Sequence, residues 1–299
     1  MSLTPECSMN SLKGSPRHDG TTPLILAAAM GHEDCVRELL AQGADPACCR
    51  TSSARVGVWP GQTGTSALFF AAQGGFLEVA RALLHAGAAI DAPSTNCAYM
   101  WPRLQDGGTP LFVACQCGHL PVVHELIARG ADVNSCMKDK ATPLFIAAQN
   151  GHEDACRALL SAGAAVDALR SDRATPLWIA AQCGHDHVVR LLLRAGAYVD
   201  QVRQDGATPL FKAAHKGHSA VVSELLKYKP NLGLLPNGQT ALHGAAIFGQ
   251  MSCVKLLARA GGVRMRNSAS LTAAQAAQAA GKHDVVAYLK AREDARGHT

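Results

Sequence analysis

Apolar and polar residues follow one another along this chain in a block that recurs many times. In one copy, Thr208 and Pro209 precede an apolar stripe from Leu210 to Ala214, and Gly217 follows shortly after. The stripe has helical spacing. The Thr hydroxyl predicts a helix N-cap, the Pro suits the first helical position, and the Gly ends the helix. A second apolar stripe over residues 219–228 predicts a second helix, after which polar residues predict an extended turn.

The opening residue of this block marks its period. It is Thr or Ser, and it recurs at Thr22, Ser66, Thr109, Thr142, Thr175, Thr208, Thr240 and, in looser form, Thr272. The successive gaps are 44, 43, 33, 33, 33, 32 and 32 residues. Neither short helix can bury its apolar face alone, so neighbouring blocks must stack on one another. The pattern therefore predicts an all-α repeat solenoid, not the two globular domains that 299 residues would suggest.

The phrases T-P-L, A-A-x-x-G-H, L-L-x-x-G-A and D-G recur in phase over residues 19–290, and they resemble ankyrin repeats. The resemblance implies stacked helix-turn-helix units joined by β-hairpin-like loops, in about eight repeats. It also implies partner binding through the hairpin tips and the inner-helix surface, with no chemistry of its own. We expect residues 19–290 to form the repeat domain. Residues 1–18 and the polar tail 291–299 are expected to be disordered.

Two insertions, near residues 47–63 and 92–105, account for the two long gaps. Both fall where the repeat places its hairpin loop, which tolerates extra length. One interpretation makes Trp59 and Trp101 exposed anchors for a partner. The other makes the insertions disordered loops, or segments added by alternative or mispredicted splicing. The absence of periodicity in either insertion favours the second interpretation.

Composition excludes several classes of protein. Charged residues make up 17% of the chain and aromatic residues 5%, so Leu, Val, Ile and Ala must dominate the core. The net charge of +5 is too small to indicate a dedicated nucleic-acid binder. Eleven cysteines without a C-x-x-C pair, and a start without a signal-like apolar region, favour an intracellular protein, cytoplasmic or nuclear. No window of about 18 apolar residues predicts a membrane span.

Candidate catalytic and metal-binding residues are few. Cys115, Cys117 and His119 form the only metal-like spacing, C-x-C-x-H, but residues two apart on a helix point to different faces. The histidines of the G-H phrase would lie too far apart in a stack to share an ion, and we expect them to make structural hydrogen bonds. No nucleophile elbow, P-loop or H-E-x-x-H helix occurs. The sequence therefore predicts no enzyme, no metal and no cofactor.

An aromatic residue follows T-P-L in consecutive repeats. These residues are Phe69, Phe112, Phe145, Trp178 and Phe211. They could form an exposed ladder for a ligand, or they could pack between repeats. Because the start of the first helix faces neighbouring repeats, we expect packing.

The resemblance to ankyrin repeats assigns the variable surface to two sets of positions. The first set, just before the Gly of G-H, comprises Gln116, Cys117, Gln149, Asn150, Gln182, Cys183, His215 and Lys216, with Gln73, Ile247 and Phe248 at the same positions. The second set, at the hairpin tips, comprises Lys138, Lys140, Ser171, Arg173 and Gln204. Basic residues converge on repeats four to six, and Asp139, Asp172 and Asp205 lie among them. This basic cluster comprises Lys138, Lys140, Arg170, Arg173, Arg203, Lys212 and Lys216. Two interpretations stay open: a surface that binds a protein partner, and a solvated face.

These residues lead to one main function and two alternatives. The main prediction is a monomeric scaffold that binds a protein partner, of unknown identity, on its concave face. The first alternative rests on the segment HELIARGADVN, which resembles ankyrin segments that an iron- and 2-oxoglutarate-dependent dioxygenase hydroxylates. The resemblance implies Asn134 as the hydroxylated residue, with Leu126 eight residues before it and Asp132 two before it. Asn134 could instead only hydrogen-bond its own hairpin. Nucleic-acid binding through the basic tips is the third possibility.

Overall fold

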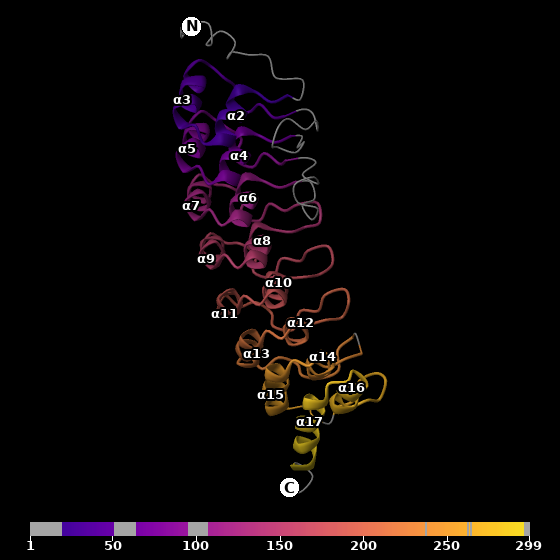
Figure 1. Ribbon diagram of the computed structural model, residues 1–299. Coiled ribbons are helices and arrows are strands. Elements are labelled where there is room, and N and C mark those ends of the chain that lie inside the picture. The colour runs from indigo at the N-terminus through magenta and orange to yellow at the C-terminus, as the bar shows by residue number, and fades with distance from the viewer. Residues whose placement is uncertain are drawn as a thin grey trace. The chain divides into compact units, whose positions relative to one another are not determined.

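The computed structural model describes residues 20–50, 64–94, 107–236, 238–261, 263 and 265–295. Within these residues the chain forms sixteen helices in eight consecutive pairs, α2 to α17 (Figure 1). The chain divides into two compact units. Unit 1 is Met1–Ala147 with Arg157–Ala164, and unit 2 is Ala148–Cys156 with Ala165–Thr299. Most of the two predicted insertions, near residues 47–63 and 92–105, lies outside the described residues, and so do Trp59, Trp101 and the N-terminal residues 1–19.

Unit 1 contains three complete helix pairs. They are α2 (Pro23–Met30) with α3 (Glu33–Ala41), α4 (Ala67–Gly74) with α5 (Leu77–His85), and α6 (Pro110–Cys117) with α7 (Leu120–Ala128). The first helices α2, α4 and α6 pack on one another, and the second helices α3, α5 and α7 form a parallel row. Helices α8 (Pro143–Asn150) and α9 (Glu153–Ser161) contribute residues to both units.

Unit 2 contains four complete pairs. They are α10 (Pro176–Cys183) with α11 (Asp186–Arg194), α12 (Pro209–Lys216) with α13 (Ser219–Leu226), α14 (Ala241–Ile247) with α15 (Met251–Ala260), and α16 (Ala273–Ala279) with α17 (His283–Ala295). The first helices α10, α12, α14 and α16 pack in one row and the second helices in another (Figure 1). The predicted all-α repeat solenoid is therefore confirmed. Helix α17 continues to Ala295, past residue 290, where the sequence placed the start of a polar tail.

The first helices begin as the T-P-L phrase predicts. The side-chain oxygen of the opening Thr or Ser accepts a hydrogen bond from the backbone N–H three residues later, at 3.2–3.3 Å, in all eight repeats. This bond satisfies one of the backbone donors that a helix start leaves without a partner. The Leu and the paired Ala positions that follow are buried; Leu111, Leu144, Leu177 and Leu210 have no exposed surface. The residue that caps each first helix is therefore followed by the residues that this helix buries.

The hairpin turns keep one hydrogen-bonded frame, and this frame shows where the insertions enter. In the fourth repeat, Met137 N–H bonds the carbonyl of Ala141 at 3.0 Å, and Lys140 N–H bonds the carbonyl of Met137 at 2.8 Å. The corresponding bonds of Arg50 are its N–H to the carbonyl of Thr65, at 3.1 Å, and its carbonyl from the N–H of Gly64, at 2.7 Å. Ser94 N–H likewise donates to the carbonyl of Gly108 at 2.9 Å, and the Ser94 carbonyl accepts from the N–H of Gly107 at 2.8 Å. In the sequence, residues 51–63 and 95–106 thus follow and precede residues that in other repeats are separated by two turn residues.

Ion pairs join the second helices of successive repeats. In unit 1, Glu125 accepts from both Arg81 and Arg129, with N···O distances of 3.0 Å. In unit 2, the largely buried Glu224 binds Lys227 and, at 3.5 Å, Arg190. Hydrogen bonds from Arg81 and from Lys227 lower the pKa of Glu125 and of Glu224, respectively. Both glutamates therefore hold a negative charge between repeats, on the row away from the first helices.

Helix length and polarity also bear on membrane insertion. No helix among the described residues is long and apolar enough to cross a bilayer.

Candidate functional site

The candidate surface lies at the C-terminal ends of the first helices, where histidines join successive repeats. Nε2 of each histidine donates to a backbone carbonyl of the preceding repeat at 3.0 Å, in the pairs His119–Gln73, His185–Gln149 and His218–Gln182. The proton must sit on Nε2, because a carbonyl oxygen can only accept. The predicted structural role is confirmed for these three histidines.

The same rings also explain the glycine of the G-H phrase. Gly184 has φ +86°, which favours glycine, and a Cβ there would lie 2.7 Å from Nδ1 of His218. Gly75 and Gly151 face the next repeat's histidine in the same way, with a Cβ distance of 2.6 Å. Backbone and ring therefore lock the end of each first helix in register. The side chains just before the glycine are presented at this locked end.

The C-x-C-x-H motif does not come together as a metal site. Cys115 is buried, whereas Cys117 is half-buried, and burial raises the pKa of the Cys117 thiol. Nε2 of His119 is already bonded to Gln73. In the described part of the chain, no group of three or more His, Cys, Asp or Glu side chains could hold a metal ion.

The aromatic residues after T-P-L separate into two kinds. Four of them, Phe69, Phe112, Phe145 and Trp178, are at most 5% exposed. Nε1 of Trp178 donates to the carbonyl of Ala207 in the next repeat at 3.0 Å. The predicted packing role is confirmed for these four. Phe211 differs, because its ring is half-buried and belongs to the surface of unit 2.

The first set of predicted surface residues lies where expected on the helices. All of them are half-buried or exposed: Gln116, Cys117, Gln149, Asn150, Gln182, Cys183, His215 and Lys216. In unit 2, Gln182 and Cys183 end α10 while His215 and Lys216 end α12, and these two helices pack on each other. Gln116 and Cys117 end α6 in unit 1.

The second set occupies exposed turns. Lys138 and Lys140 lie in unit 1, whereas Ser171, Arg173 and Gln204 lie in unit 2. Gln204 N–H donates to the carbonyl of Asp172 at 2.9 Å, which joins two consecutive tips. Lys140 and Arg173 both have φ 66°, a left-handed conformation that costs a non-glycine residue about 1 kcal/mol.

Two arginines of the predicted basic cluster are neutralised by a carboxylate. Nε of Arg170 lies 2.9 Å from Oδ1 of Asp172, and Nε of Arg203 lies 2.8 Å from Oδ2 of the same group. The hydrogen bond from Arg170, aided by that from Arg203, holds the pKa of Asp172 well below its usual range. Arg203 also stacks 4.8 Å from the ring centroid of Trp178. Arg170 and Arg203 therefore stabilise the tips and add little free positive charge to the surface.

A second cluster in unit 2 was found only in part by the sequence. We call it the α12–α14 patch, formed by Phe211, Lys212, His215, Lys216 and Phe248. The His215 ring lies 4.0 Å from that of Phe248 and 6.2 Å from that of Phe211, between centroids. Phe248 is 51% exposed. The contribution of Phe211 was missed because its four counterparts in other repeats are core residues.

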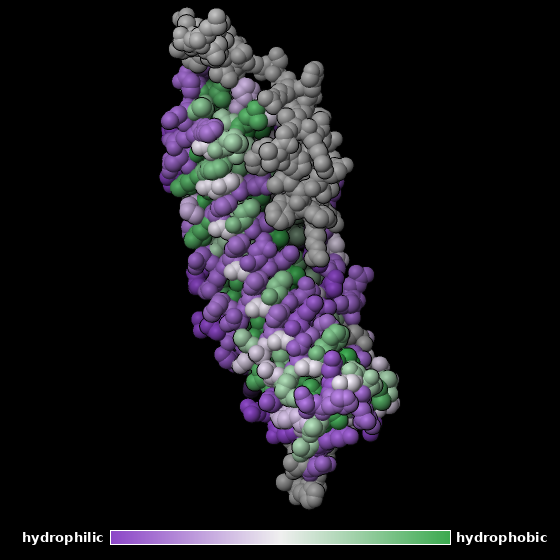
Figure 2. Space-filling view, in the orientation of Figure 1, coloured by the Kyte–Doolittle hydropathy of each residue, from purple (hydrophilic) through white to green (hydrophobic). Residues whose placement is uncertain are grey.

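His215 is neutral at the centre of this patch. Burial lowers its pKa, and the charges of Lys212 and Lys216 lower it further. Its Nδ1 is buried and has no hydrogen-bond partner among the described residues. A buried polar atom without a partner is uncommon in native proteins and calls for an explanation. Figure 2 shows hydrophobic and hydrophilic residues side by side over the C-terminal repeats of unit 2.

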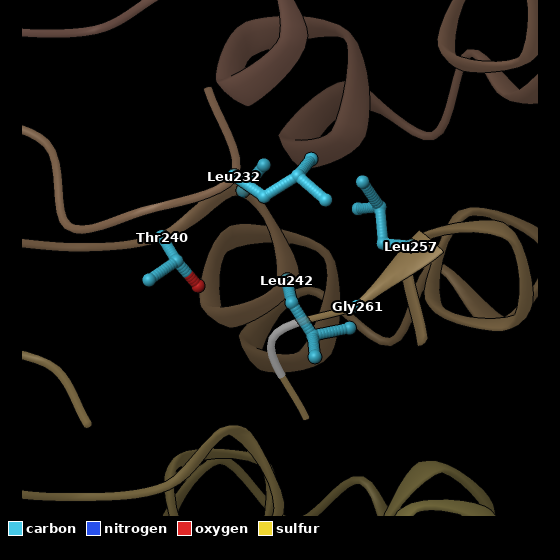
Figure 3. A pocket seen from close by; sticks show the side chains of 6 residues that line it. Leu232, Thr240, Leu242, Leu257 and Gly261 are labelled. Carbon is cyan, nitrogen blue, oxygen red and sulfur yellow. The ribbon is translucent and has the colours of Figure 1, made fainter. Parts of the chain in front are cut away.

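One pocket of unit 2 lies apart from both sets of residues. Leu232, Leu242 and Leu257 line it together with Thr240 and Gly261 (Figure 3). Its volume of about 10 Å³ is that of a single water molecule, which is too small for an organic ligand. We therefore do not assign this pocket near α14 as a ligand site.

Asn134 lies in the turn after α7 and is exposed. Its backbone N–H donates to Oδ1 of Asp132 at 2.9 Å, and its Nδ2 donates to the carbonyl of Gly163 at 3.4 Å. The bond with Asp132 is the local turn contact expected of the simpler interpretation. Leu126, eight residues earlier, is fully buried.

Comparison with known proteins identifies the repeats. The family described as ankyrin repeats (3 copies) matches residues 3–96, 56–136, 91–169, 111–203 and 177–266. A crystal structure of the human ASB11 ankyrin repeat domain is 30% identical, with a TM-score of 0.66, and the match covers 81% of this chain and 98% of that chain. No curated protein sequence matches. Ankyrin repeats are typically protein-interaction modules and are generally non-catalytic. With its matched segments spanning residues 3–266, the chain belongs to the ankyrin-repeat family.

Proposed function

We propose that this chain is a non-enzymatic scaffold that binds a protein partner through its first-helix ends and hairpin tips. The observation that carries the proposal is a division of labour within each repeat. The fold depends on the Thr caps, the buried Ala pairs and the hydrogen bond from each G-H histidine to the preceding repeat. The predicted surface residues make none of these contacts with their side chains and are half-buried or exposed. A surface that varies on a constant frame suits recognition of a macromolecule.

Other parts of the proposal follow from the sequence. Segments such as TSALFFAAQGGFLEVARALLHAGA and LLKYKPNLGLLPNGQTALHGA resemble ankyrin repeat domain-containing protein 29, which consists of ankyrin repeats only. This resemblance and the cysteine usage support an intracellular, monomeric protein, cytoplasmic or nuclear, that acts without a cofactor.

Affinity capture from cells, read by quantitative mass spectrometry, tests the function. A surface variant carries Lys138→Ala, Arg173→Ala, Gln182→Ala and Lys216→Ala. A control variant carries Arg194→Ala, Lys255→Ala, Arg259→Ala and Lys290→Ala, all at exposed second-helix positions. We expect the surface variant to lose proteins that the wild type and the control retain. Identical captured sets for all three chains would count against the proposed surface.

A second candidate function is modification of Asn134 by an asparaginyl hydroxylase. The exposure of Asn134 supports access to its amide, whose Nδ2 donates to the carbonyl of Gly163 over a long distance of 3.4 Å. Mass spectrometry of the peptide containing Asn134, from cells with and without a 2-oxoglutarate-competitive inhibitor, tests this idea. We expect an inhibitor-sensitive gain of one oxygen. Its absence in both samples would remove the hypothesis without affecting the scaffold proposal.

A further inference from the structure

The first helices of unit 2 carry positive charge without compensating acid. Helices α10, α12, α14 and α16 contain no Asp or Glu, and their only charged side chains are Lys212 and Lys216. These two lysines lie four residues apart, on the same face of α12. Neither has a carboxylate partner among the described residues.

The acids in the hairpin segments before α10, α12 and α14 already bind other groups. Asp172 is held by Arg170 and Arg203, and Asp205 binds Nη1 of Arg203 at 3.1 Å. Asp200 accepts the backbone N–H of Asn231 at 3.0 Å. The charge of Lys212 and Lys216 therefore stays unbalanced within the described part of unit 2.

An apolar platform adjoins the two lysines. Gly244 makes it possible, because a Cβ at this position would lie 2.9 Å from Cε2 of Phe211. The Phe211 ring can therefore lie against α14, and the neutral His215 ring bridges it to the half-exposed Phe248. An exposed aromatic residue beside a buried, unpartnered His215 Nδ1 is typical of a surface that a ligand completes.

We propose that the α12–α14 patch binds an acidic peptide segment of a protein partner, in which an aromatic or large aliphatic residue lies among Asp and Glu residues. The apolar residue packs on Phe248 and the rings beside it, and the flanking carboxylates pair with Lys212 and Lys216. Complementary charge places the segment along the row, and burial of the aromatic contact supplies most of its affinity. This inference rests on the proposed scaffold function and names the chemistry of its partner.

A peptide is a better match to the patch than a nucleic acid. Binding to a phosphate backbone depends on many cationic contacts in a row. The α12–α14 patch contains two lysines, and Asp172 and Asp205 stand at the neighbouring tips. A platform with two flanking charges suits one apolar side chain between two acids.

Selection of a displayed library of random short peptides on the purified full-length protein tests the inference. We expect the enriched peptides to combine Asp or Glu with Phe, Trp or Leu. Labelled synthetic copies, measured by fluorescence anisotropy at physiological salt, should bind Lys212→Glu/Lys216→Glu and Phe248→Ala about tenfold or more weakly than the wild type. The matched controls are Lys255→Glu/Lys290→Glu, at exposed second-helix positions, and Tyr228→Ala, at an exposed position in the turn after α13; they should bind like the wild type.

Several outcomes would overturn the inference. These are failure to enrich any peptide, enriched peptides without acidic residues, and affinities that the patch variants leave unchanged. A single-stranded oligonucleotide that binds the wild type more tightly than the peptides, and loses this binding in the lysine variant, would show a nucleic-acid site instead. Equal thermal unfolding of all variants excludes misfolding as the cause. If a hairpin-tip variant with only Lys138→Ala and Arg173→Ala loses the captured cellular proteins while the patch variants retain them, the scaffold function stands and the patch inference fails.

Discussion

The first-helix rows of the two units share one frame and present different surfaces. In unit 1, α2, α4 and α6 have no charged residue; their sequences are PLILAAAM, ALFFAAQG and PLFVACQC. In unit 2, α12 has the sequence PLFKAAHK. Lys212 takes the place of Phe70 and Val113, which are at most 4% exposed. The Lys side chain is tolerated because its Nζ lies 5.7 Å from the Trp178 ring, a favourable cation–π geometry.

This difference shows how a repeat protein separates folding from recognition. The Thr cap, the buried Leu and Ala, and the Gly–His junction recur in both units, so they set the fold. The remaining positions of the first helix can change without disturbing the frame. Unit 2 uses them for a basic and aromatic patch, whereas in unit 1 they are uncharged in α2, α4 and α6.

The largest expected effect concerns the shared frame. Leu177→Ala in α10 removes a side chain with no exposed surface, and we expect a loss of about 2–5 kcal/mol in unfolding free energy. Leu24→Ala in α2 should cost less, because the end of a stack opens locally more readily than its centre. Urea unfolding gives the two losses, and amide hydrogen exchange locates them. Equal protection of α2 and α10 would contradict this order.

The Gly–His junction should show a smaller loss that can be divided into two parts. Gly184→Ala combines a positive φ with a Cβ 2.7 Å from His218, and we expect a loss of about 2–3 kcal/mol. Gly196→Ala has a similar φ of +90° with no atom within 4 Å of the new Cβ, so it should cost about 1 kcal/mol. Thermal unfolding of both variants gives the difference. If they lose the same stability, the ring contact contributes nothing.

The ion pairs of Asp172 with Arg170 and Arg203 should make the stability of unit 2 depend on pH. The folded-state pKa of Asp172 is lowered, so its contribution is present above the unfolded-state pKa and is lost as the pH falls through the folded value. We expect Asp172→Asn to cost about 1 kcal/mol at neutral pH, and this difference from the wild type to shrink below about pH 5. Arg203→Gln should reproduce part of the loss. Urea unfolding across this pH range provides the measurement, and a constant difference at every pH would contradict it.

The smallest expected effect lies within the patch and involves no loss of fold. The charge of Lys216 helps to lower the pKa of His215, so Lys216→Gln should raise that pKa. Lys255→Gln, on α15, is the matched control and should leave it unchanged. Titration of the His215 ring resonances by NMR measures both. A His215 pKa that does not respond to Lys216→Gln would mean that Lys216 does not contribute to lowering it.

Much of the fold could be read from the residues, because each repeat folds by local rules. The Thr caps, the helix-ending glycines and the packed aromatic residues from Phe69 to Trp178 were predicted from spacing alone. The positive φ of Lys140 and Arg173 can also be read from the sequence, since both occupy a position where other repeats have glycine. The predicted partner-binding residues, from Gln116 to Lys216, stay predictions, because exposure permits binding without requiring it.

By itself, the sequence determined the period, the two helices of each repeat, the place of the insertions and the role of the histidines, because these depend on interactions within one repeat or on a motif repeated in phase. Only the tertiary structure decided that Asp172 is shared by arginines of two hairpins, and that Phe211 leaves the core to join His215 and Phe248. These contacts join residues of neighbouring repeats. Their geometry depends on how closely the repeats stack, on the space that Gly244 leaves for the Phe211 ring, and on which side chains of neighbouring repeats come within bonding distance of each other.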